Sequence, residues 1–154
     1  MKTGVGLLLL SASLLACGRG EPPPAMEAAS PAVAQDAVAA SGIDACAGMD
    51  LQLTPARRVA YAGHVVSAVD GKVAAADVQT SRFVGDGDWS LVHAAIPIAD
   101  PGYFLFETVD GATVSRGVWA GFAEEGDRSG LIDWATSRGA PEAFARCFAQ
   151  TVLD

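Results

Sequence analysis

Basic residues are scarce in this chain. Ten lysines and arginines stand against 18 aspartates and glutamates among 154 residues, which gives a formal net charge of −8. Nucleic-acid backbones are bound by clusters of Lys and Arg, so this balance argues against a nucleic-acid partner. It argues equally against electrostatic binding to anionic lipid headgroups. A basic protein partner is compatible with it.

Histidine and cysteine are also rare, which limits the available chemistry. The chain has two histidines, His64 and His93, and three cysteines with no Cys-x-x-Cys pair. Ser90 precedes His93 by three residues in an expected strand, so the two side chains face opposite sides of the sheet. Gly-x-Ser-x-Gly and glycine-rich phosphate loops are absent from the sequence. We therefore predict no catalytic residue, no metal site and no cofactor.

Acidic residues cluster in an expected turn, and they leave one enzymatic alternative open. Asp86 and Asp88 have the spacing that begins a calcium loop, but the further ligands and the closing glutamate of an EF-hand are missing. The alternative is a hydrolase with an unconventional site, in which Asp86, Asp88 and His93 converge in a cleft.

No apolar run reaches the roughly 20 residues that a bilayer span needs. The run that follows Lys2 is shorter and ends at Leu14-Leu15-Ala16-Cys17. A positive start, a short apolar run and a small residue before the cut are typical of an export signal. The segment resembles the lipobox signal of bacterial lipoproteins. The resemblance implies that residues 1–16 are removed and that Cys17 carries the lipid; the alternative is a plain secreted protein that is cut nearby.

The same resemblance implies a location and a domain plan. Gly18, rather than an aspartate, follows the cysteine, which favours the outer membrane and its periplasmic face. Residues 17–42 are rich in Ala and Pro and are interpreted as a disordered tether, with a single domain at 43–154. Cys46 and Cys147 remain as an even pair in an oxidising compartment, so we predict that they form a structural disulfide.

Hydrophobic spacing and turn residues predict an α+β domain. Short connections force the neighbouring strands into a four-stranded antiparallel meander, packed against helices that we expect on one side. Pro101-Gly102 and Asp110-Gly111 are the expected turns after the second and third strands. The order is α-β-β-β-β-α-α. The expected helix, four strands and two further helices cover residues 55–69, 78–84, 89–98, 103–109, 112–120, 124–138 and from Pro141 onward.

Aromatic side chains are the main candidates for a binding surface. Most of them are expected in the core, including His93 as a cross-strand packing residue beside Trp89 and Leu91. An exposed patch rimmed by acids would instead bind protein. The first candidates for contact with a partner are Trp119, Tyr103 and His93, chosen from a set of sheet-associated aromatics that also includes Phe104, Phe106, Phe122 and Trp134.

These observations favour a non-enzymatic binding protein tied to the membrane through its lipid, with a basic periplasmic protein as the expected partner. In general architecture only, such a protein resembles lipoproteins that inhibit cell-wall hydrolases or give immunity to toxins. The alternative is a structural or accessory lipoprotein that acts in envelope assembly or maintenance.

Overall fold

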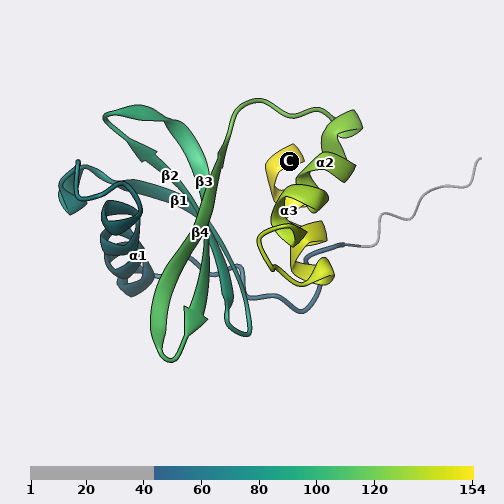
Figure 1. The fold of residues 1–154 in the computed structure, drawn as a ribbon, viewed down its shortest axis with the longest axis horizontal. Coiled ribbons are helices and arrows are strands. Elements are labelled where there is room, and N and C mark those ends of the chain that lie inside the picture. The colour runs from purple at the N-terminus through teal and green to yellow at the C-terminus, as the bar shows by residue number, and fades with distance from the viewer. Residues whose placement is uncertain (1–43) are drawn as a thin grey trace, which may run out of the picture. The chain divides into compact units, whose positions relative to one another are not determined.

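The computed structural model describes residues 44–154 and shows the predicted α+β fold (Figure 1). The predicted signal segment 1–16, Cys17 and the tether 17–42 lie outside the described residues. Among residues 44–154, no helix is both long and apolar enough to cross a bilayer. The elements, in order, are α1 (Pro55–Ala68), the short 3-10 helix η1 (Ala75–Asp77), β1 (Gln79–Asp86), β2 (Trp89–Ile96), β3 (Ala99–Val109), β4 (Ala112–Ala120), the 3-10 helix η2 (Glu125–Asp127), α2 (Arg128–Thr136) and α3 (Glu142–Leu153).

The four strands form the predicted meander, in the order β1-β2-β3-β4 with antiparallel neighbours. Asp110 and Gly111 both have positive φ, of 50° and 78°, as a type I′ turn between β3 and β4 requires. The turn predicted at Pro101-Gly102 is wrong. The loop between β2 and β3 is instead Pro97-Ile98, which the pair Ile96 and Ala99 flanks.

Two features of proline explain this difference. Pro97 has the fixed φ that suits the first position of a tight turn. Pro101 lies inside β3, where the register shifts between the pairs Ala94–Gly102 and Ile96–Ala99. An interrupted ladder tolerates a residue that has no N–H to donate.

Helices cover both faces of the sheet rather than the single face that we expected. In Figure 1, α1 lies on one side of the strands, and α2 and α3 lie on the other. β3 supplies both cores, because Phe104 and Phe106 point toward α1 while Leu105 points toward α3. The two-sided apolar pattern of this strand therefore reflects two helical layers.

The helices differ in detail from the predicted ones. Thr54 caps α1, accepting a hydrogen bond from the Arg57 backbone N–H at 3.2 Å. Val65 of α1 is fully buried against the sheet, whereas Val59 of the same helix is 77% exposed. This rotation of α1 about its axis is set by Tyr61, whose ring packs edge-on against Phe83 with ring centroids 5.3 Å apart. The helix predicted at 124–138 divides into η2 and α2.

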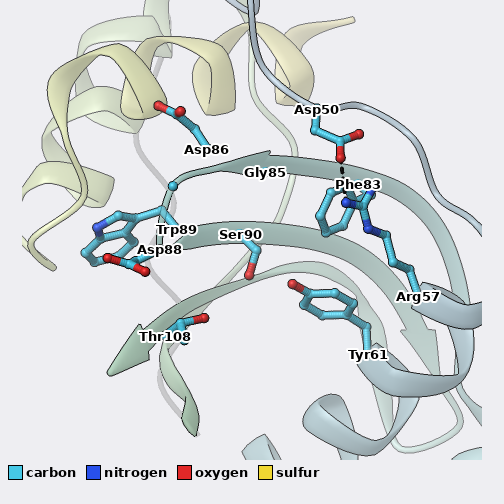
Figure 2. A pocket seen from close by; sticks show the side chains of 11 residues that line it. Asp50, Arg57, Tyr61, Phe83, Gly85, Asp86, Asp88, Trp89, Ser90 and Thr108 are labelled. Carbon is cyan, nitrogen blue, oxygen red and sulfur yellow. Dashed lines mark hydrogen bonds and ion pairs between the residues drawn. The ribbon is translucent and has the colours of Figure 1, made fainter. Parts of the chain in front are cut away.

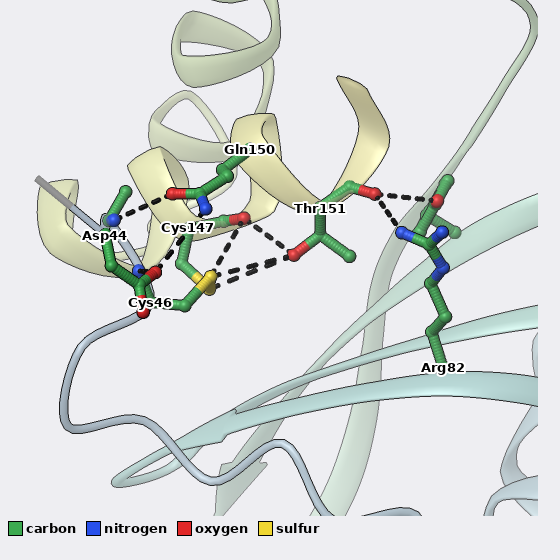
Figure 3. The surroundings of a disulfide bond; sticks show 8 residues. Asp44, Cys46, Arg82, Cys147, Gln150 and Thr151 are labelled. Atoms are coloured by element: carbon green, nitrogen blue, oxygen red, sulfur yellow. Dashed lines mark hydrogen bonds between the residues drawn. A yellow bond between two sulfur atoms is a disulfide. The ribbon is translucent and has the colours of Figure 1, made fainter. Parts of the chain in front are cut away.

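The predicted disulfide between Cys46 and Cys147 is present (Figure 3). It fixes the segment before α1 to the buried side of α3. Gln150 reinforces this junction, since its Oε1 accepts a hydrogen bond from the Ala45 backbone N–H at 2.7 Å. The hydroxyl of Thr151 bonds within the same turn of α3, to the carbonyl of Cys147 at 2.8 Å.

Candidate functional site

The three residues predicted to contact a partner form a row across the sheet. His93, Tyr103 and Trp119 occupy paired positions on β2, β3 and β4. The ring centroids of His93 and Tyr103 are 4.7 Å apart, and those of Tyr103 and Trp119 are 6.1 Å apart. The structure therefore brings all three together, on the side of the sheet that faces α3.

This row supports α3, and each of its members is half-buried. The Tyr103 hydroxyl donates a hydrogen bond to the Thr151 carbonyl at 3.1 Å, and burial raises the pKa of Tyr103. Phe148 of α3 packs edge-on against both Tyr103 and Trp119. Trp119 also borders a hollow at the surface.

That hollow lies where the chain leaves β4 and enters α2. It has a volume of about 390 Å³, and Trp119, Phe122, Ala123, Leu131 and Asp127 are among its lining residues. The side chain of Phe122 is fully exposed at its edge. Sequence reasoning placed Phe122 with the core aromatics. Its exposure is indicated by its position after Gly121, outside any strand, where no sheet neighbour covers it.

One acidic residue, Asp127, is among the residues that line this hollow. Glu124 and Asp127 cap η2 reciprocally, and the Glu124 backbone N–H donates to the Asp127 carboxylate at 2.9 Å. Arg128, the nearby cation, already pairs with Glu125 at 2.9 Å. Asp127 forms no ion pair within residues 44–154, so the rim keeps a negative charge.

Negative charge also exceeds positive charge across residues 44–154 as a whole. Each lysine and arginine of residues 44–154 already contacts a carboxylate or a backbone carbonyl. The carboxylate pairs are Arg57–Asp50, Lys72–Asp70, Arg116–Glu107, Arg128–Glu125 and Arg146–Glu142, and the carbonyl partners of Arg58, Arg82 and Arg138 belong to Thr80, Thr151 and Trp134. A partner therefore meets an excess of uncompensated carboxylates.

One polar pair in the structure was not predicted from the sequence. The Ser81 hydroxyl and His93 Nδ1 lie 2.6 Å apart across β1 and β2. Burial, with a smaller effect from Arg82, lowers the pKa of His93, which favours the neutral form of the ring. This pair could not be predicted because it depends on a register shift between Thr80 and Arg82, which places Ser81 beside His93. Catalysis also needs a group that orients the histidine, and within residues 44–154 no hydrogen bond reaches its other nitrogen.

The residues of the hydrolase alternative do not converge. Asp86 and Asp88 line a cavity on the α1 side of the sheet, at the turn between β1 and β2 (Figure 2). His93 lies on the opposite face, four residues along β2 from the turn, or about 13 Å. His64 packs against Tyr61 on α1, with ring centroids 5.4 Å apart, and burial lowers its pKa. Within the described range, no group of three or more His, Cys, Asp or Glu side chains is arranged to hold a metal ion.

Comparisons with protein-family models, with curated proteins and with solved structures found no match to this chain.

Proposed function

We propose that this protein is a non-enzymatic binding module for a basic protein, held by a lipid on Cys17 at the periplasmic face of the outer membrane. The observation that carries the proposal is the fully exposed Phe122 beside Trp119, at a hollow with an acidic rim.

The energetic argument starts from Phe122. Moving a large apolar side chain out of water contributes about 1.5–3 kcal/mol, and a partner that covers Phe122 gains this contribution. Protein interfaces concentrate binding energy in such aromatic anchors, surrounded by a polar rim. Trp119 forms one side of the hollow, and edge-on packing against Phe148 of α3 fixes the position of its ring.

Charge supports a basic partner. Asp127 at the hollow and the net charge of −8 favour rapid encounter with a cationic surface. Within this proposal the partner is a basic cell-wall hydrolase or a toxin, which the module inhibits.

The test is capture from periplasmic extract, followed by affinity measurement with the purified partner. Phe122→Ser removes the exposed ring, and Val59→Ser is the matched control, because Val59 is also exposed but lies on α1. We expect a basic protein to bind the unchanged module and Val59→Ser equally. Phe122→Ser should weaken its affinity at least about tenfold, and added salt should slow association.

Capture that Phe122→Ser leaves unchanged would refute this binding surface. If no specific protein is captured, and deletion disturbs the envelope without any toxin challenge, the accessory function is the correct one.

A further inference from the structure

The two edges of the sheet differ in how far they are covered. At the edge formed by β1, Gly85 exchanges two main-chain hydrogen bonds with Asp50, of 2.8 and 2.9 Å. The Thr80 carbonyl of the same strand accepts a hydrogen bond from the Arg58 guanidinium. Within residues 44–154, the main chain of β4 forms no hydrogen bond other than those with β3. In Figure 1, the helices lie to either side of β4 and none crosses its ribbon, so this edge is open to a further strand.

The alternation of the ladder shows which main-chain groups of β4 face outward. The Thr108 N–H donates to the Asp88 carbonyl at 2.8 Å, so the main-chain groups of Thr108 face β2. Every second residue of an antiparallel strand faces the same neighbour, so the main-chain groups of Phe104 face β2 as well. Val118 lies directly opposite Phe104, and its own N–H and C=O therefore point away from β3. Both groups are available to another strand.

The side chains of this edge are apolar on both faces of the sheet. Val118 lies on the α1 side with Phe104 and is 41% exposed, while Trp119, on the α3 side, is half-buried. Directly opposed side chains on neighbouring strands lie about 4.5–5.5 Å apart, so a strand added at the edge would contact both residues. A partner lying on one face of the sheet would contact only one of them. The edge therefore favours a strand as its occupant.

The charge of the edge indicates which strand that is. β4 contains no acidic residue, and its one basic residue, Arg116, is turned back to β3, where its Nε lies 2.6 Å from a carboxylate oxygen of Glu107. Arg116 is also the extra residue of a bulge opposite Leu105 and Phe106, so the segment that follows it, residues 117–120, carries no charge. A basic partner gains nothing from charge at such an edge. Two copies of this acidic chain, by contrast, approach one another with least repulsion there.

We propose that two copies of this protein pair through residues 117–120 of β4, antiparallel and related by a two-fold axis, so that the two sheets become continuous. Such an interface is self-complementary, because both copies supply the same outward N–H and C=O groups. The inference does not rest on the proposed function, because it requires neither Phe122 nor a foreign partner.

The test is sedimentation equilibrium of the mature chain, residues 17–154, with Cys17→Ser to keep it free of lipid. We expect a reversible equilibrium between monomer and dimer. Val118→Lys places a charge on the uncharged edge and should raise the dissociation constant at least about tenfold. Val59→Lys is the matched control, because it makes the same change at an exposed valine of α1, and it should leave the dissociation constant unchanged. Urea midpoints show whether both variants remain folded.

Hydrogen exchange of the unchanged mature chain distinguishes strand pairing from contact between side chains. Exchange of the Val118 amide should slow as the dimer forms, because its outward N–H becomes hydrogen-bonded. The Trp119 amide faces β3 and is bonded in both states, so its exchange should change less. Slow exchange of the Val118 amide at every concentration would mean that another part of the same chain covers the edge, and would overturn the proposal.

A monomer at every concentration up to about 1 mM would also overturn it. If the Val118 amide were then protected only by a captured basic protein, the edge would receive a strand of that protein instead. A dimer that resists Val118→Lys and dissociates with Phe122→Ser would place the interface at the hollow, which again contradicts pairing through β4. We expect the dimer to persist in Phe122→Ser, so the failure of this inference and the failure of the proposed function are distinguishable.

Discussion

Cys46 and Cys147 are joined across 101 residues of sequence, with their Cα atoms 4.6 Å apart. The bond closes nearly the whole described domain into one loop, since Cys46 precedes α1 and Cys147 lies in α3. A cross-link over so long a loop removes much of the freedom of the unfolded chain. The first prediction concerns its contribution to stability.

Replacing both cysteines, as Cys46→Ala with Cys147→Ala, should lower the free energy of unfolding by up to about 4–5 kcal/mol. Urea denaturation measures the loss. Reduction of the unchanged protein by dithiothreitol is the control and should produce a similar decrease. Unaltered unfolding in both experiments would mean that the bond adds nothing to the stability that the core already provides.

A second prediction tests which side of α1 is buried. Val65→Ala should destabilise the domain by about 2 kcal/mol, because it removes two buried carbons and leaves a cavity against the sheet. Val59→Ala makes the same chemical change at an exposed position of the same helix, and its effect should be close to zero. Chemical denaturation of the two variants compares them directly, and equal losses would contradict the orientation of α1.

The sequence alone could not predict which side of α1 is buried. Alanine and valine recur at several spacings in this helix, so periodicity alone does not define one apolar stripe. The rotation is decided by Tyr61 packing on Phe83, a contact between residues 22 positions apart. By contrast, Asp110-Gly111 determines its turn locally through positive φ, and that turn was predicted correctly.

The candidate sites were less predictable than the fold for a similar reason. The alignment of Tyr103 with Trp119 follows from the register of the meander, but their cover by Phe148 depends on where α3 docks. Ser81 meets His93 through a register shift that no local pattern encodes.

Stability should also depend on pH through the two histidines. Burial lowers the folded-state pKa of His64 and His93 below their ordinary value of 6.5. The unfolded chain therefore takes up more protons than the folded domain as the pH falls past 6.5. The contribution of the histidines should be constant above about pH 7.5, and stability should decrease as the pH drops through 6.5 toward the folded-state values.

Urea midpoints at about pH 5 and pH 7.5 measure this effect. His64→Gln should reduce the difference between the two midpoints, since it removes one of the two titrating groups. Hydrogen bonds from Arg57 and Arg146 lower the pKa values of Asp50 and Glu142 from their ordinary values of 3.8 and 4.5, which already lie below this pH range. A midpoint that rises on acidification would contradict the assignment.

The last prediction concerns Cys17, which lies outside the described residues. Its thiol should carry diacylglycerol at the N-terminus of the mature chain, after removal of residues 1–16. Several acyl chains on one residue give firm membrane attachment, whereas a single chain binds reversibly. Mass spectrometry of the membrane fraction should therefore find a lipidated N-terminal Cys17. Cys17→Ser should abolish the lipid mass while the folded domain keeps its disulfide and its urea midpoint. An unmodified, uncleaved leader on the unchanged protein would remove the basis for the membrane location, and the binding function would then have to be tested on a protein that is not anchored.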